Sequence, residues 1–175
     1  MNTTIKDMLE RRSIRKFKSD MVPRDLIDEV IEAGLYAANG KGKQAPIIIA
    51  VTEPALHAQI VRDNCRIGGW KEGHDPFYGA PVILIVLAPK DWPNSVYDGS
   101  LVMGNLMLAG HALGLGTIWI NRAKEEFEEP AYQDLLKKLG IEGEYIGIGH
   151  CALGYRDCDL PKAPARRANR VYYVS

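Results

Sequence analysis

The sequence lacks a long uninterrupted apolar run, and it has little cysteine. The longest apolar run extends from Ala80 to Ala88, which is too short to cross a bilayer. The first residues, MNTTIKDML, have no basic stretch followed by an apolar block, so we expect no secretory signal peptide. The three cysteines, an odd number, do not make a disulfide framework, which suits a reducing compartment. We therefore expect a soluble cytoplasmic protein with no membrane partner.

The motifs of common catalytic and metal centres are also missing. The patterns G-x-S-x-G, P-loop and H-E-x-x-H do not occur. Cys151 and Cys158 are seven residues apart and Cys65 is distant, a spacing that fits neither a zinc site nor an iron–sulfur cluster. The histidines do not cluster, and for both His111 and His150 we favour a structural role over chemistry. We predict no metal centre.

What is present is the composition of one globular domain over residues 1–175. The chain is 46% hydrophobic and 25% charged, and it contains no internal repeat or linker. Helical and strand patterns alternate imperfectly, so we predict an α+β fold with a central sheet flanked by helices. Helices are expected from Thr4 as cap, from Pro23 to Ala38, and over 55–64, 96–113 and 125–139; strands are expected over 47–52, 81–88, 117–120 and 144–153, with a β-like VYYV near the end.

The helix expected from Val96 to Leu113 is apolar on nearly every face. Such a pattern predicts a helix that is buried on all sides. An isolated chain of this size would have difficulty burying such a helix fully.

One Gly-rich stretch, GIGHCA from Gly147 to Ala152, matches the dinucleotide fingerprint G-x-G-x-x-[GA]. That motif requires a helix to open at once behind a strand, with its N-terminus toward a pyrophosphate. Here LGYRDCDLPKAP follows, with two prolines and no helical periodicity. We therefore interpret the stretch as a closely packed, Gly-rich strand rather than a Rossmann motif.

Positive charge is gathered at two places in a chain whose formal net charge is zero. Residues 11–18 carry five cations, and residues 162–170 carry four more. Without those nine, 13 of the 22 basic residues remain against 22 acidic ones. The clusters could be solvated faces, nucleic-acid contacts or a phosphate clamp; the acidic remainder and the missing motifs argue against nucleic acid. Arginine forks with the Ser13 hydroxyl suit phosphate, and the loop GKGKQ (Gly40 to Gln44) adds two lysines and permissive glycines.

Five segments, in order along the chain, resemble those of the FMN-dependent nitroreductase family. ERRSIRKF is similar to the N-terminal signature of that family. The other four resemble its second helix with cofactor loop and strand, its central strand, its buried helix with the next strand, and its C-terminal basic loop. They are VPRDLIDEVIEAGLYAANGKGKQAPIIIAVT, GAPVILIV, DGSLVMGNLMLAGHALGLGTIWI and GHCALGYRDCDLPKAPARRANRVYYV. Their order over nearly the whole chain carries the resemblance.

The resemblance implies a set of cofactor-binding residues for FMN. Residues of the first cluster (residues 11–18, called the basic segment from here on) would hold the phosphate and ribityl chain, with Arg15 at the N1/O2 edge of the ring. The loop after the second helix would approach FMN from the partner subunit, although it carries NGKGKQAP where many members have S-x-x-N-x-Q-P-W. A stretch after the third strand would lie near the flavin N5, and two arginines would close on the phosphate. These residues are Arg11, Arg12, Ser13 and Arg15; Asn39, Gly40, Lys41 and Gln44; Trp119, Ile120 and Asn121; and Arg166 and Arg167.

For the whole molecule, the resemblance implies a mostly antiparallel sheet, an intertwined homodimer and a two-step reaction. NAD(P)H would pass hydride to the flavin N5, and a nitroaromatic, quinone or related acceptor would then take the electrons in the same pocket. No catalytic side chain is needed for such a reaction. Two alternatives stay open: a non-enzymatic flavin-binding or redox-sensing protein, and a specialist reaction on the same fold, such as reductive dehalogenation. The residues neither identify the acceptor nor distinguish NADH from NADPH.

Overall fold

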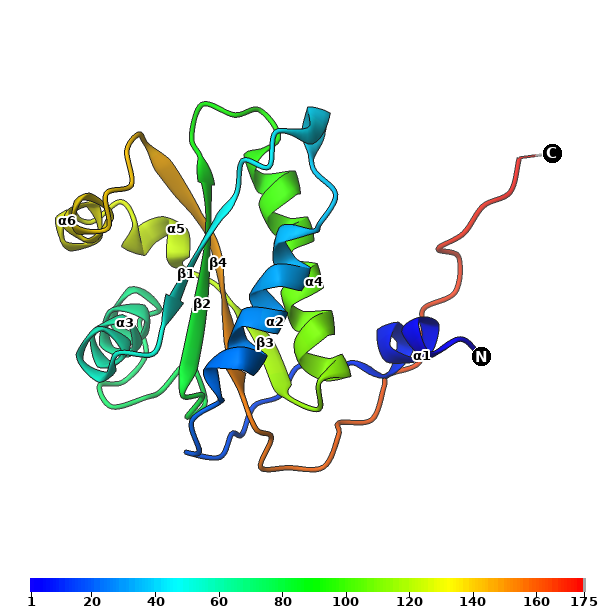
Figure 1. Ribbon diagram of the computed structural model, residues 1–175. Helices are drawn as coiled ribbons and strands as arrows, with labels where there is room; N and C mark the ends of the chain where they lie inside the picture. The colour runs from blue at the N-terminus through cyan, green and yellow to red at the C-terminus, as the bar shows by residue number, and fades with distance from the viewer. Residues whose placement is uncertain (175) are drawn as a thin grey trace.

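The computed structural model describes residues 1–174, and a four-stranded sheet lies at its centre (Figure 1). The strands lie in the order β1-β2-β4-β3, and every neighbouring pair is antiparallel. This arrangement confirms the predicted α+β class and antiparallel sheet. The strands are β1 (Ile47–Val51), β2 (Val82–Pro89), β3 (Gly116–Ile120) and β4 (Tyr145–Gly154).

Helices cover both faces of this sheet. Figure 1 shows α2 and α4 on one face, and α3, α5 and α6 on the other, while α1 stands near the lower end of α4. The C-terminal segment runs past α1 and away from the sheet. The helices are α1 (Thr3–Glu10), α2 (Arg24–Leu35), α3 (Pro54–Ile67), α4 (Ser95–Ala112), α5 (Ala123–Glu126) and α6 (Pro130–Lys138), with a short 3₁₀ turn, η1 (Gly40–Gly42).

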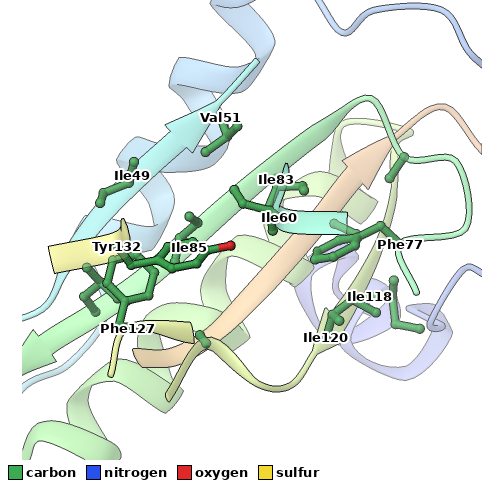
Figure 2. Packing of buried hydrophobic residues seen from close by; sticks show 14 of the residues in the cluster. Ile49, Val51, Ile60, Phe77, Ile83, Ile85, Ile118, Ile120, Phe127 and Tyr132 are labelled. Carbon is green, nitrogen blue, oxygen red and sulfur yellow. The ribbon is translucent and has the colours of Figure 1, made fainter. Parts of the chain in front are cut away.

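The position of strand β2 accounts for its continuously apolar sequence. Because side chains alternate along a strand, Ile83 and Ile85 point into one core while Leu84 and Val86 point into the other. Figure 2 shows Ile83 and Ile85 packed in the first core, the one under α3, α5 and α6. The second core lies between the sheet and helices α2 and α4. A strand buried on both faces has no position at which a polar side chain would be solvated.

Two helix expectations need correction. The helix expected over 125–139 is two helices, because α5 ends at Glu126 and α6 begins at Pro130. Proline lacks the amide hydrogen and clashes with the carbonyl four residues earlier, so it ends one helix and suits the first turn of the next. The cap of α1 is Asn2 rather than Thr4, since the Asn2 side chain accepts a hydrogen bond from the Thr4 backbone N–H at 2.9 Å.

Helix α4 is not buried on every side of the single chain. Its inner face packs on the sheet, where a Cβ at Gly99 would come within 2.5 Å of the Ile148 side chain. Its outer face leaves Val96, Tyr97 and Leu101 exposed. Residues 171–174, the expected β-like VYYV, are also exposed and form no strand within the described chain. No helix within residues 1–174 is long and apolar enough to cross a membrane.

The stretch GIGHCA lies entirely inside β4, and no helix follows it within the described residues. Its glycines serve close packing, as predicted. A Cβ at Gly147 would lie 2.1 Å from the backbone of Ala123, and one at Gly149 would lie 2.6 Å from the indole nitrogen of Trp119. Any side chain at these two positions would push α5 or Trp119 away from the sheet.

Candidate functional site

The basic segment is held along the free edge of the sheet. After α1 ends, Ser13 forms a parallel bridge with Thr117 of β3, and the Ile14 N–H donates to the Thr117 carbonyl at 3.0 Å. Ile14 and Phe17 are buried in the core, whereas Arg15 is exposed. The alternation of apolar and basic residues thus fixes the segment to the fold while its charges stay at the surface.

Arg11 and Arg12 lie half-buried at the start of this segment. Arg12 donates from Nη1 to the carbonyls of Leu9 and Arg11, each at 2.7 Å, which satisfies the end of α1. Arg11 Nη1 and Arg12 Nε are buried and have no hydrogen-bond partner within residues 1–174. Burial, and then the neighbouring charge of Arg12, lower the pKa of Arg11. Two adjacent cations with unused donors make a site that an anion would stabilise.

The far end of β3 opens onto a cavity of about 480 Å³. Trp119 and Asn121 line this cavity, together with Ser100 of α4 and Lys124 of α5. The Trp119 indole nitrogen is buried without a hydrogen-bond partner in the described chain, and Asn121 is exposed. The volume falls in the range of small-molecule sites. The basic segment and these residues therefore share one strand, β3, at its start and at its end.

The loop from Asn39 to Gln44 is anchored at the N-terminal end of α4. The Gly40 N–H donates to Asp98 Oδ1 at 2.9 Å, and Asp98 Oδ2 accepts from the Trp92 indole at 2.7 Å. The Asn39 side chain accepts from the Gln44 N–H at 2.8 Å and so closes the loop. Lys41 adopts a left-handed backbone conformation, with φ of 55°, and its side chain is exposed.

This loop and the basic segment lie toward opposite ends of α4. The loop contacts Asp98, whereas Thr117, the partner of Ser13, packs against Gly110. These two α4 residues are about 18 Å apart at the rise of an ideal helix. No hydrogen bond or ion pair of the described residues joins the loop to the basic segment. The single chain therefore does not bring these two groups of predicted residues together.

The C-terminal segment lies beside the basic segment at Arg156 and Asp157 and then runs away from it. The Asp157 N–H donates to the Lys16 carbonyl at 2.9 Å, and the two side chains form an exposed ion pair at 2.8 Å. Arg166 and Arg167 lie further along, in the exposed segment that runs away from the sheet (Figure 1). Arg166 donates to the carbonyl of Pro164. No hydrogen bond or ion pair to the basic segment is formed by either arginine within residues 1–174.

Arg122, which directly follows the predicted stretch, was not among the residues predicted from the sequence. Its backbone is left-handed, with φ of 83°, and its guanidinium lies 4.2 Å from the ring centroid of Trp70. The contact ties the turn after β3 to the loop after α3. Adjacency to Asn121 was the only signal for it, because nothing local marks a cation that stacks on a distant ring. The described residues contain no group of His, Cys, Asp and Glu that could hold a metal ion.

Comparison with known proteins adds to this geometry. The family model that matches is that of the nitroreductase family, over residues 8–155. A relative from Methanothermobacter thermautotrophicus, whose name places it with NADH dehydrogenases and NAD(P)H nitroreductases, is 34% identical over 129 residues. That match covers 65% of this chain and 60% of the relative, so this chain spans less than two thirds of the relative's length.

Two further proteins match over most of their length. An iodotyrosine deiodinase of Thermotoga neapolitana is 26% identical over 174 residues, which is 89% of each chain. The crystal structure of a nitroreductase with bound FMN from Bacteroides fragilis superimposes with a TM-score of 0.90 at 24% identity. The match covers 100% of both chains, and at that identity it establishes the shared fold.

Proposed function

Since this chain belongs to the nitroreductase family, we propose that it is an FMN-dependent oxidoreductase that uses NAD(P)H as its electron donor. The observation that carries the proposal is the pair Arg11 and Arg12. Each has a buried guanidinium nitrogen without a partner in the described chain, beside the free edge of β3. Such donors fit the dianionic phosphate of FMN, because arginine forks match phosphate oxygens and the anion would offset the mutual repulsion of the two cations.

The residues beside the two ends of β3 would then have different roles toward the cofactor. At its start, Arg11, Arg12 and Ser13 bind the phosphate and ribityl chain, while Arg15 stabilises negative charge at the N1/O2 edge of the ring. At its end, Trp119 and Asn121, which line the cavity, would orient the ring and exclude water from one side, whereas Ile120, whose side chain is buried in the opposite core, would contribute only its backbone. FMN supplies the hydride chemistry when bound, and the chain supplies orientation and electrostatics.

We propose that the site is completed by a second copy of the chain. The loop from Asn39 to Gln44 points to this, because it is anchored toward the far end of α4 from the basic segment. The exposed apolar face of α4 (Val96, Tyr97 and Leu101) supports the same arrangement, since a homodimer would cover it. Arg166 and Arg167, exposed on the C-terminal segment, would close on a phosphate only after that segment is placed by the dimer.

The proposed reaction has two half-reactions in one cavity. NAD(P)H and the electron acceptor, a nitroaromatic or quinone, would occupy the cavity at the end of β3 in turn. Steady-state rates test this sequence when donor and acceptor are varied together: double-reciprocal plots should be parallel, as a two-step mechanism requires. Intersecting lines would contradict the shared cavity. FMN that binds but is never reduced would favour a flavin-binding or redox-sensing protein instead.

A second candidate function is reductive dehalogenation. It is favoured by the similarity to the Thermotoga neapolitana iodotyrosine deiodinase over 89% of both chains. A comparison of electron acceptors on one sample of reduced protein distinguishes the two candidate functions. If 3-iodotyrosine reoxidises the reduced protein with release of iodide, and faster than a quinone does, dehalogenation is its activity. If the quinone or nitroaromatic is the faster acceptor, the first candidate stands.

A further inference from the structure

Three polar side chains lie fully buried behind the turn that follows β3. They are Asn64 of α3, Glu126 of α5 and His150 of β4, and each has 0% exposure. Asn64 Nδ2 donates to Glu126 Oε1 at 2.8 Å, and His150 Nε2 lies 2.7 Å from Glu126 Oε2. The Phe77 ring packs against the imidazole nearly at a right angle, with centroids 5.4 Å apart. We call Asn64, Glu126 and His150 the buried polar cluster.

One proton is shared between the histidine and the glutamate. Glu126 Oε2 and His150 Nε2 have no partner other than each other in the described chain, and 2.7 Å is too short for two bare acceptors. For Nδ1 to donate to the Ile120 carbonyl as well, the pair has to be either imidazolium with carboxylate or imidazole with carboxylic acid. The Asn64 amide nitrogen must face Glu126, because the neighbouring oxygen atoms are acceptors.

The buried polar cluster ends on two successive carbonyl groups of the turn. Asn64 Nδ2 also donates to the Asn121 carbonyl at 2.8 Å, and His150 Nδ1 lies 3.4 Å from the Ile120 carbonyl. In a planar trans peptide, the N–H points opposite to the preceding carbonyl. The N–H groups of Asn121 and Arg122 therefore point away from the cluster. Neither is a donor in the turn and loop hydrogen bonds of residues 1–174.

Stability alone does not account for the polarity of this cluster. Desolvating a buried ionisable pair is costly, and apolar residues of similar volume are often as stabilising or more so. The surroundings are apolar, since Phe77, Ile120 and Phe127 belong to the adjoining core. What a hydrophobic triad could not do is hold two carbonyl groups at fixed positions, because only donors can.

We propose that Asn64, Glu126 and His150 are positioning residues, which fix the Ile120–Asn121–Arg122 turn so that its N–H groups face the reacting edge of the flavin. The inference rests on the proposed function for the role of the turn, whereas the rigidity of the turn is a property of the chain itself. Glu126 acts by orienting the other two, and none of the three touches the cofactor. Removing the donors would leave the fold in place and let the turn move.

The test compares substitutions of three buried side chains. Asn64→Leu removes the donor to Asn121 and keeps the volume, whereas Glu126→Gln keeps both hydrogen bonds, because its amide oxygen accepts from Asn64 and its amide nitrogen donates to neutral His150. Tyr132→Phe is the control: it deletes the 3.0 Å bond from Tyr132 to Asp63, next to Asn64 on α3, without any link to the turn. The two readouts are the NMR order parameters of the Asn121 and Arg122 amides in FMN-free protein and the anaerobic reduction of FMN-loaded protein by NADH or NADPH.

For Asn64→Leu we expect the order parameters of the Asn121 and Arg122 amides to fall from about 0.85, the value of rigid backbone, to below about 0.6, because the turn loses the hydrogen bond that holds its carbonyl. Reduction by the nucleotide should slow by about tenfold as well, with FMN affinity changed less than about threefold, since the phosphate is held elsewhere. Glu126→Gln and Tyr132→Phe should resemble the parent chain in both readouts. Unchanged order parameters at the turn in folded Asn64→Leu would overturn the proposal. If the parent chain itself is not reduced, the proposed function fails, and the order parameters of the FMN-free protein still decide whether the cluster positions the turn.

Discussion

At the scale of single residues, Arg11 and Arg12 are the strongest indication of an anion site. Their unpaired guanidinium nitrogens, without partners in the described chain, are half-enclosed by the fold, and burial together with repulsion lowers the pKa of Arg11. A depressed pKa on a cationic group means that the folded chain disfavours this charge relative to the unfolded chain. The bound anion, rather than the apoprotein, would be what makes the arrangement favourable.

Opposite effects on binding and on stability are expected for Arg11→Gln. FMN affinity should fall by about tenfold to a hundredfold, the usual range for a lost charge-assisted hydrogen bond. The FMN-free variant should melt at the same or a higher temperature than the parent, because a destabilised charge has been removed. Fluorescence titration with FMN and thermal melts measure the two effects. Arg24→Gln, which breaks an exposed ion pair with Asp28, is the matched control and should retain parental FMN affinity.

The cysteines give a second prediction at this scale. Burial raises the pKa of Cys151 to about 12, so its thiolate fraction near pH 8 is about 10⁻⁴. Cys65 is buried as well, whereas Cys158 is exposed. A disulfide reagent should therefore titrate Cys158 rapidly in folded protein, and the other two only after denaturation. Cys158→Ser should abolish the rapid phase; a persistent rapid phase would show that a buried thiol is accessible.

The same raised pKa sets the direction of a pH effect on stability. The folded chain keeps the Cys151 proton to about pH 12, whereas the unfolded thiol, with an ordinary pKa of 9.0, loses it earlier. Stability should therefore fall as pH rises from about 9 toward 12, and this loss should be absent below that window. Urea unfolding at a series of pH values measures it. Cys151→Ala should flatten the dependence, and an unchanged slope in that variant would contradict the assignment.

At the scale of elements, the contact between β4 and α5 places the end of β3 beside the cavity. Gly147 allows this contact, since a Cβ there would lie 2.1 Å from the Ala123 backbone and 2.5 Å from the Lys124 nitrogen. At Gly99 of α4 the obstacle is different, because the nearest atoms belong to the Ile148 side chain. A side chain can change rotamer, whereas a backbone segment has to move as a unit.

We therefore expect Gly147→Ala to lower the free energy of unfolding by about 2–4 kcal/mol, as overpacking against backbone does. Gly99→Ala should cost distinctly less, since Ile148 can rearrange and alanine is the better helix former. Urea unfolding of both variants gives the comparison. Equal losses, or a neutral effect at Gly147, would mean that α5 does not press on β4 as described.

Elements that are marked by residues adjacent in the sequence could be predicted, whereas contacts between distant residues could not. Strand β2 was evident because a short, largely β-branched apolar run is typical of a buried strand, and the basic segment because its charges are adjacent. The break at Pro130 overrode a helical pattern that continued through it. The buried polar cluster could not be predicted: Asn64 and Glu126 are 62 residues apart, and each alone resembles an ordinary helix residue.

At the scale of the whole molecule, one face of α4 remains without a cover in the single chain. Leu101 on that face is 49% exposed, and Leu139 at the end of α6, over the other face of the sheet, is 51% exposed. Because the two leucines are about equally exposed in one chain, Leu139 serves as a control for the loss of an exposed leucine at Leu101. The proposed homodimer assigns Leu101, and not Leu139, to the interface.

Leu101→Glu should therefore shift the protein toward monomers and weaken FMN binding with it, because burying a carboxylate in an apolar interface is costly. Leu139→Glu should leave both the mass and FMN affinity at parental values. Sedimentation velocity with and without FMN measures the assembly. A dimer that survives Leu101→Glu unchanged would remove α4 from the interface, and with it the reason to place the Asn39–Gln44 loop at a partner's cofactor.

The proposed function requires that the chain binds FMN and lets NAD(P)H reduce it. The most direct test is a visible absorption spectrum of purified protein, supplied with FMN and freed of excess, during anaerobic addition of NADH and then NADPH. We predict flavin absorption that stays with the protein, bleaches with at least one nucleotide and returns when a quinone or nitroaromatic is added. Protein that retains no flavin would contradict the assignment of Arg11, Arg12 and Ser13 to the phosphate, and retained flavin that never bleaches would contradict the proposed reaction.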